Sequence, residues 1–195
     1  MIYLILGLAI FLGAHSVRIF AGDWRAAQIV RLGEKRWKGV YSLVSATGLA
    51  LIIWGYGLAR TDTLVLWSPP TALRHLAAGL VLPAFILLVA AYLPGTRIKA
   101  KIGHPMVAGV KLWALAHLMA NGSLADVTLF GAFLAWAVAD FISARRRDRA
   151  VGRSYPVLGG SRDAIAIGIG FGAWALFAFH GHAWLIGVEP FRIGG

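Results

Sequence analysis

Apolar runs long enough to cross a lipid bilayer dominate this chain. A transmembrane helix needs about 20 predominantly apolar residues to span a hydrocarbon core of about 30 Å. The sequence holds six such runs, at residues 2–20, 40–59, 75–93, 105–120, 124–142 and 164–186. Charged residues make up only 14% of the chain, where soluble domains hold roughly a quarter. We therefore predict an all-α fold, a polytopic integral membrane bundle of about six transmembrane helices.

The connections between these runs are short, and the longest covers residues 144–163. They leave no room for a separate soluble domain, so we expect one membrane domain over residues 1–195. The first run has no basic stretch before it and carries His15 and Arg18 near its end. It is therefore expected to be retained as a helix rather than removed as a signal peptide.

The net charge of +11 is distributed unevenly along the chain. Fifteen of the nineteen Lys and Arg residues lie either at the end of the first apolar run, as Arg18 does, or in the connections that follow the first, third and fifth runs. The positive-inside rule places those connections, residues 21–38, 95–103 and 144–163, in the cytoplasm and both termini on the outer side. Basic loops of this kind set the topology and contact anionic lipids, so the predicted partner is the lipid bilayer and not nucleic acid.

Several chemistries are excluded or unsupported. The chain has no cysteine, which excludes disulfides, iron–sulfur ligation and thiolate ligation of haem. It has no HExxH pair for a zinc hydrolase, and no nucleophile elbow, Walker loop or dinucleotide-binding fingerprint.

Two histidines lie in the fourth apolar run. His104 opens this run, and His117 lies deep within it, beside Trp113 and Leu118. Ionisable groups inside membrane segments are costly and mark candidate functional sites. Thirteen residues separate the two histidines along the helix, a rise of about 20 Å. They cannot bind one metal ion together.

Single histidines on several helices suit haem b, which takes axial imidazoles from two different helices of a bundle. His15 and His117 are the most deeply placed candidates, and we expect both to bind the haem iron. Arg18, about one turn past His15, is placed for a haem propionate. Asn121, about one turn past His117, is placed for a hydrogen bond in the same pocket.

Alternatives to that pair stay open at this point. The imidazoles could simply bond to backbone carbonyls between helices. With an outer N-terminus, His15 lies about 20 Å below the outer end of its helix, whereas His117 lies about one turn from the outer end of its own. His75 with His117, or His15 with His104, are therefore the reserve ligand pairs.

The remaining chemistry-bearing residues have structural interpretations. Asp126 and Asp140 could serve in a proton relay, but helix capping and pairing with the arginines at 145–147 explain them more simply. His180 and His182 project to opposite faces of the last run, and we interpret them as interfacial or structural.

Four blocks of sequence carry a resemblance to a known family. They are LGAHS at 12–16, GEKRWKGVYSLVSATGLALIIWGY at 33–56, RH at 74–75 and GHPMVAGVKLWALAHLMANG at 103–122. With these blocks, at least the first 145 residues resemble the NnrU family of bacterial membrane proteins.

The resemblance implies a multi-span inner-membrane protein associated with denitrification and nitric-oxide metabolism, and for such a protein the outer side on which we expect the termini is the periplasm. It also implies kinship with the zeta-carotene isomerase of plants and cyanobacteria, a haem b enzyme. There the histidine of the LAH element is a haem ligand, which corresponds to His117, and the second ligand corresponds to His15. The isomerase has a cysteine where this chain has Ala114, so a switch to sulfur ligation is excluded. The arginine usual before the HP element is replaced by Gly103.

Three functions from different classes follow. The first is a haem b membrane protein in nitric-oxide-related redox chemistry, or an isomerase, acting on a gaseous or lipid-soluble small molecule. The second is a membrane methyltransferase that uses S-adenosylmethionine, which would bear an RHP element at a helix mouth; Gly103 argues against it. The third is a non-catalytic assembly or transport factor. Visible absorption of the purified protein separates the first function from the others.

Overall fold

A computed structural model of the chain describes residues 1–191, and its regular elements over that range are helices. These are α1 (Ile2–Phe20), α2 (Gly22–Leu32), α3 (Glu34–Ala59), α4 (Thr71–Tyr92), α5 (Arg97–Ile102), α6 (Pro105–Ala120), α7 (Leu124–Ala150), α8 (Ser161–Leu176) and α9 (His182–Ile186), with a π-helical turn η1 (Phe177–Gly181) between the last two. The predicted all-α membrane bundle is confirmed as a fold class.

Within residues 1–191, five helical stretches are long and apolar enough to cross a membrane: α1, α3, α4, α7 and the continuous stretch Gly160–Ile186 that contains α8, η1 and α9. The sixth predicted segment, α6, is apolar but has only 16 residues, a length of about 24 Å. The number of spans and the side on which the termini lie stay predictions.

Helical structure extends beyond the apolar runs into the connections that carry most of the basic residues. The predicted loop 21–38 contains α2 and the start of α3, the predicted loop 95–103 contains α5, and α7 continues to Ala150. Hydropathy indicates where the contact of a helix with lipid ends. The helix itself can continue past that point, because Arg and Ala are good helix formers in water as well.

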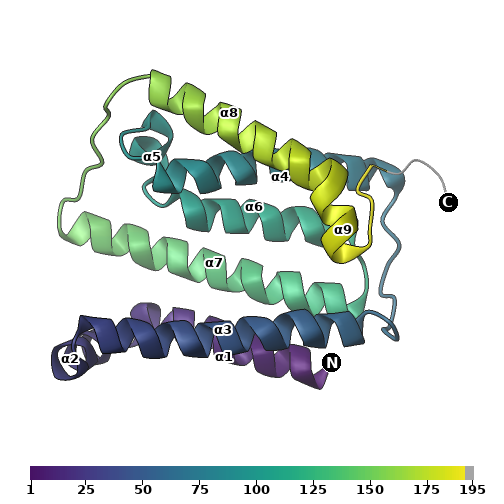
Figure 1. Cartoon of the computed structure of the whole chain (residues 1–195), viewed down its shortest axis with the longest axis horizontal. Helices are drawn as coiled ribbons and strands as arrows, with labels where there is room; N and C mark the ends of the chain where they lie inside the picture. The colour runs from purple at the N-terminus through teal and green to yellow at the C-terminus, as the bar shows by residue number, and fades with distance from the viewer. Residues whose placement is uncertain (192–195) are drawn as a thin grey trace.

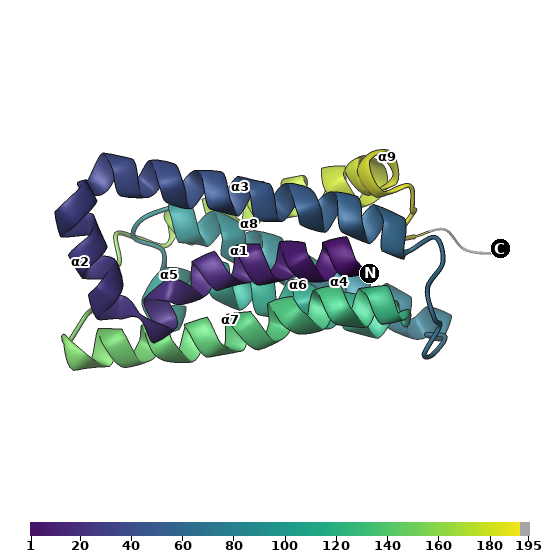
Figure 2. The same cartoon turned by 90° about the horizontal axis from the view of Figure 1, so that it is seen from below.

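The helices lie side by side in the order α8, α4, α6 and α7, followed by the pair α1 and α3 (Figure 1). The short helix α2 crosses the ends of α1 and α3 (Figure 2). The first turn of α1 and helix α9 lie at the same end of the bundle (Figure 1), which is the end predicted to face outward. The opposite end, with α2 and α5, is the predicted cytoplasmic end.

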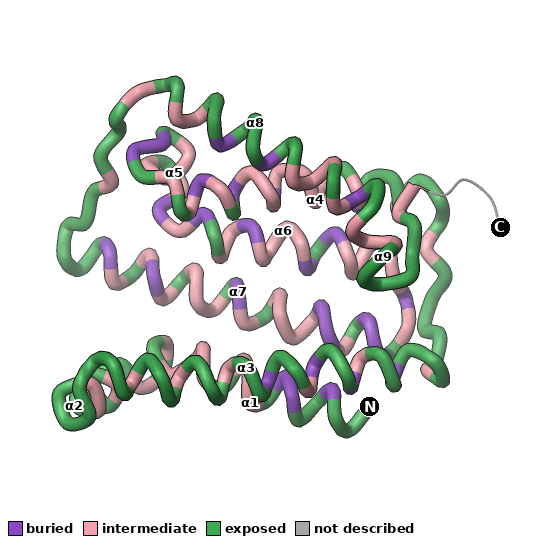
Figure 3. Tube along the Cα trace, in the orientation of Figure 1, coloured by how far each residue is buried: buried purple, intermediate pink, exposed green. Residues whose placement is uncertain are grey.

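Buried positions form narrow stripes between helices, and the outward faces are exposed (Figure 3). Those faces carry large apolar side chains such as Leu43, Ile53 and Phe171. Exposed apolar surface on this scale does not occur on soluble monomers and is expected to contact lipid. The main core cluster joins α1, α3 and α7 through Leu4, Leu8, Ile52, Ala59, Ala125, Leu129 and Phe130.

Glycines allow some helices to approach backbone to backbone, as is common in membrane bundles. A Cβ atom at Gly7 of α1 would lie 2.6 Å from the backbone nitrogen of Ile52 in α3. In α8, a Cβ at Gly170 would lie 2.7 Å from Cα of Ile86 in α4, whereas Gly168 and Gly172 face open space. Among these three glycines of α8, Gly170 is therefore the one that allows close packing on α4.

Asp126 and Asp140, two of the three aspartates of α7, have the structural roles expected from the sequence. Ser123 Oγ accepts from the Asp126 backbone N–H, and the Asp126 carboxylate accepts from the Ser123 backbone N–H, a capping box that begins α7. Arg147 Nη2 lies 3.8 Å from Asp140 Oδ1. Both interpretations, capping and pairing with arginine, are confirmed.

Candidate functional site

His117 lies in the last turn of α6 with one ring nitrogen fixed. Its Nδ1 is 2.8 Å from the carbonyl oxygen of Trp113, one turn earlier. A carbonyl only accepts hydrogen bonds, so Nδ1 carries the proton and Nε2 keeps its lone pair. Metal-binding histidines have this arrangement, in which the second nitrogen donates to a carbonyl or carboxylate. His117 is therefore oriented to bind a ligand through Nε2.

Aromatic rings enclose the His117 imidazole. The Phe130 ring of α7 stacks against it at a centroid distance of 4.6 Å and an interplanar angle of 30°, and the Trp113 ring lies at 5.1 Å. These contacts restrict the rotation of the imidazole. Asn121 is not directed at the same space, because its Nδ2 donates to the backbone oxygen of His117 at 2.9 Å and closes the end of α6.

His182 is a second histidine at this end of the bundle, and the sequence did not single it out as a ligand. It is the first residue of α9, directly after the π-helical turn η1, and π-helical turns are frequent at functional sites. Its Nδ1 lies 2.7 Å from the Val188 carbonyl oxygen, so Nε2 is again the free nitrogen. Helix α9, which His182 begins, lies at the same end of the bundle as the last turn of α6, which carries His117 (Figure 1).

His15 lies in the other half of the bundle, where α1, α3 and α7 meet. Its Nδ1 is 2.7 Å from the Phe11 carbonyl oxygen, which leaves Nε2 as an acceptor. The Phe11 ring stacks on it at 4.2 Å, the Tyr41 ring of α3 lies at 5.3 Å, and the Trp136 ring of α7 stands perpendicular to it at 5.8 Å.

The structure does not bring His15 and His117 together. His15 is thirteen residues from the start of α1, and His117 is three residues from the end of α6, which lies at the same end of the bundle. The rise of the helices separates them by roughly 15 Å along the bundle axis. Three aromatic rings lie between the two histidines. The centroid of the Phe133 ring is 5.8 Å from that of Phe11 and 5.5 Å from that of Trp113.

One haem iron cannot bind both imidazoles in this arrangement, because metal–imidazole bonds are only about 2 Å long. His117 by itself fits a haem, since its Nε2 is free and its walls are apolar. The expectation that His15 is the second ligand of the same iron does not fit this arrangement. The prediction that His117 binds haem stays a prediction.

The remaining residues predicted to contact or bind the haem lie on α1, on α4 and at the start of α6. Arg18 is exposed, and its backbone oxygen accepts a hydrogen bond of 3.5 Å from Arg147 Nη1. His75 is exposed near the start of α4, at the same end of the bundle as the last turn of α6, and the reserve pair of His75 with His117 stays a prediction. His104 lies at the predicted cytoplasmic end, where α6 begins. Over residues 1–191, no group of three or more His, Cys, Asp or Glu side chains could hold a metal ion.

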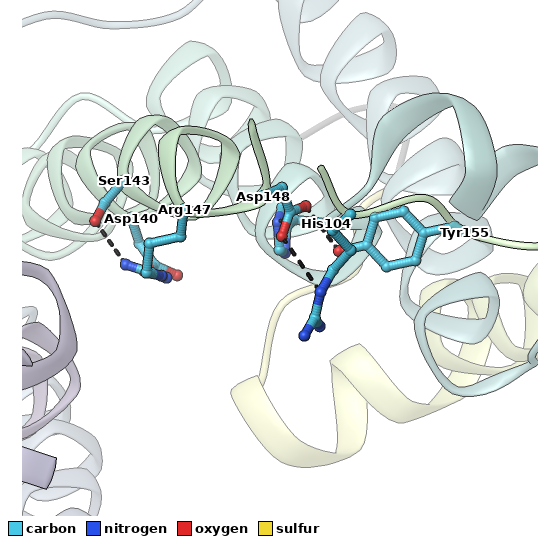
Figure 4. A network of polar contacts seen from close by, with 7 residues as sticks. His104, Asp140, Ser143, Arg147, Asp148 and Tyr155 are labelled. Carbon is cyan, nitrogen blue, oxygen red and sulfur yellow. Dashed lines mark hydrogen bonds and ion pairs between the residues drawn. The ribbon is translucent and has the colours of Figure 1, made fainter. Parts of the chain in front are cut away.

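His104 belongs to a polar network at that end (Figure 4). Its Nε2 is 2.8 Å from Asp148 Oδ2, and the Tyr155 hydroxyl donates to the same oxygen at 2.8 Å. Arg153 Nε lies 3.9 Å from the other carboxylate oxygen. Burial, and then the hydrogen bond to Asp148, raises the pKa of Tyr155, so the hydroxyl keeps its proton at neutral pH. The network joins the start of α6 to the end of α7 and the following loop.

Gly103 precedes this network with a backbone φ of +80°, and a Cβ there would lie 2.9 Å from Arg145 Nη1. A side chain is strained at such a φ. This explains why glycine replaces the arginine expected before His104.

Sequence reasoning missed Tyr41, Trp136, Asp148 and Tyr155. Asp148 carried a signal, because it is the one acid within the arginine run 145–153. Tyr41 and Trp136 carried none, because only the packing of α1 between α3 and α7 brings them to His15.

Comparison with known proteins supports the family resemblance. The family described as "NnrU protein" matches residues 3–190. No curated protein and no solved structure matches the chain.

Proposed function

We propose that this chain, which belongs to the NnrU family, is an inner-membrane protein that binds haem b through His117. The observation that carries the proposal is the His117 imidazole itself. It is held by the Trp113 carbonyl at 2.8 Å, has a free Nε2, and is walled by the Trp113 and Phe130 rings. The Nδ1 proton is already paired with that carbonyl, so Nε2 is the atom through which His117 would bind the iron.

A bound haem b supplies an iron that changes oxidation state and binds small diatomic molecules such as nitric oxide. The residues of the chain hold and shield it. The Trp113 carbonyl raises the basicity of His117 by accepting a hydrogen bond from its Nδ1–H. Phe130 and Trp113 pack against the imidazole and hold its orientation. We therefore link the function to nitric-oxide metabolism and denitrification, with a gaseous or lipid-soluble molecule reaching the site from the bilayer.

His182 is our candidate for a second ligand in place of His15. It lies at the same end of the bundle as His117, and its Nδ1 is already held by the Val188 carbonyl. Isomerase activity of the carotene type has less support, since Ala114 is fully buried where the isomerase carries a cysteine. The methyltransferase alternative has no added support either, because His104 is engaged by Asp148.

Absorption spectroscopy of protein purified from haem-replete cells tests the proposal. We expect a Soret band in the wild type and its loss in His117→Ala, with membrane insertion retained because α6 stays apolar. His180→Ala serves as the matched control and should keep the wild-type spectrum. The absence of a Soret band in the wild type, even after haemin addition, or a normal one in His117→Ala, would refute the proposal.

Electron paramagnetic resonance of the same preparations identifies the second ligand. If His182 binds the iron, His182→Ala should convert a low-spin ferric signal to a high-spin one, and His15→Ala should leave it low-spin. The reverse result would restore the pair His15 and His117 and would require a different helix register from the one described above.

A further inference from the structure

An apolar groove of about 440 Å³ lies between α4 and α8. Its lining residues are Leu88, Val89, Tyr92, Leu93 and Ile169. Leu88, Tyr92 and Ile169 are exposed, so the groove opens toward the surrounding lipid. The other lining residues lie with Leu88 and Tyr92 in the last turns of α4 or at its C-cap, apart from Ile169 of α8. The groove therefore lies near the predicted cytoplasmic end, where α5 follows α4 (Figure 1).

Arg162 of α8 is held at this end of the groove. Its Nη1 donates a hydrogen bond of 2.8 Å to the carbonyl oxygen of Pro94, the residue that follows Leu93 of the groove lining. Arg162 precedes Ile169 by two helical turns, so both lie on one face of α8, about 10 Å apart along its axis. A guanidinium group has five N–H donors, and the bond to Pro94 uses one of them. The Arg162 guanidinium can therefore keep this bond and also bind an anion.

Arg97, the first residue of α5, brings a second guanidinium group to the same end. Its Cζ atom lies 3.9 Å from the position that a Cβ on Gly160 would take, two residues before Arg162. The Asp163 carboxylate accepts hydrogen bonds of 3.1 Å from the backbone N–H groups of Arg97 and Ile98, which ties the start of α5 to the start of α8. The two guanidinium groups outweigh this one carboxylate, so the end of the groove carries positive charge.

We propose that this surface binds one anionic phospholipid, with a fatty acyl chain in the groove and the phosphate on the guanidinium groups of Arg97 and Arg162. The chain makes van der Waals contacts with both helices. Guanidinium groups bind phosphate through paired hydrogen bonds, and basic pockets between transmembrane helices on the cytoplasmic side bind anionic head groups. A zwitterionic lipid would place an ammonium group beside the two guanidinium groups, which is unfavourable. The site is independent of haem binding at His117.

Native mass spectrometry of the full-length protein in detergent tests the proposal, with titrations of phosphatidylglycerol and of phosphatidylethanolamine. We expect one phosphatidylglycerol molecule to bind each chain, more tightly than phosphatidylethanolamine. Arg162→Gln and Arg97→Gln should each weaken the binding of phosphatidylglycerol about fivefold, the contribution of one basic residue near an anionic lipid surface. Ile169→Trp keeps every charge and fills part of the groove, so it should weaken the binding of phosphatidylglycerol as well.

The matched control is Arg149→Gln, which removes the same charge from an exposed position in the last turn of α7, on the far side of α6 from the groove (Figure 1). It should bind phosphatidylglycerol as the wild type does. An equal loss in Arg149→Gln and Arg162→Gln would mean that only the overall charge attracts the lipid, and would overturn the proposal. Equal affinity of the wild type for both lipids, or wild-type affinity in Ile169→Trp, would overturn it as well.

Discussion

The Tyr56 hydroxyl of α3 donates a hydrogen bond of 2.6 Å to Oδ1 of Asp126 in the first turn of α7. The other carboxylate oxygen of Asp126 is occupied by Ser123, whose hydroxyl donates to it at 2.6 Å. One buried aspartate therefore both begins α7 and joins it to α3. This contact fixes the register of the two helices near His117.

Removal of the Tyr56 hydroxyl should destabilise the fold. Tyr56→Phe leaves Asp126 Oδ1 buried without its partner, and such a loss costs about 1–3 kcal/mol. Thermal unfolding in detergent should show a clear decrease in the transition temperature. Tyr92→Phe is the control, because Tyr92 is 75% exposed. Equal transition temperatures in both variants would contradict a structural role for the Tyr56 hydrogen bond.

Close packing of α1 on α3 gives a second prediction. A Cβ at Gly48 would lie 2.7 Å from the backbone nitrogen of Phe11, whereas a Cβ at Gly57, on the same helix, meets nothing within 4 Å. Gly48→Ala should therefore lower the free energy of unfolding by about 1–3 kcal/mol through overpacking. Gly57→Ala should be neutral or slightly stabilising. Denaturation monitored by circular dichroism compares the two, and a neutral Gly48→Ala would mean that α1 and α3 are farther apart.

The sequence predicted the fold class well because length and hydropathy decide it. All six apolar runs are helical, and the start of α7 at Leu124 follows directly from the chemistry of Ser123 and Asp126. Hydropathy does not predict α2 and α5, because these helices lie in polar connections outside the apolar runs.

The candidate site was predictable only in part. Sequence spacing identifies His117 as a deep histidine, but it does not say how far α1 and α6 are shifted along the bundle axis. That shift separates His15 from His117. The partners of His15, Tyr41 and Trp136, come from helices distant in sequence, so only the packed structure reveals them.

The Asp148–Tyr155 contact predicts that the stability of the fold decreases at alkaline pH. The pKa of Tyr155 is raised in the folded state, so the unfolded chain loses this proton at a lower pH than the folded one. The contribution of the contact is therefore complete below pH about 10, the ordinary tyrosine pKa, and is lost as the pH rises through the folded value. Thermal unfolding at pH 8 to 11 should show a steeper decline for the wild type than for Tyr155→Phe. Parallel declines would argue against the contact.

The uneven distribution of basic residues predicts the topology. Arg147 is one of six arginines that follow the fifth apolar run. Asp62 lies in the connection between α3 and α4, and the basic residues nearest to it are Arg60 and Arg74. Because Lys and Arg are retained in the cytoplasm, alkaline phosphatase fused after Arg147 should be inactive and the same enzyme fused after Asp62 should be active. Green fluorescent protein, which fluoresces when it folds in the cytoplasm, should give the opposite pattern at both positions. Phosphatase activity after Arg147 would reverse the orientation and place the His104–Asp148 network outside.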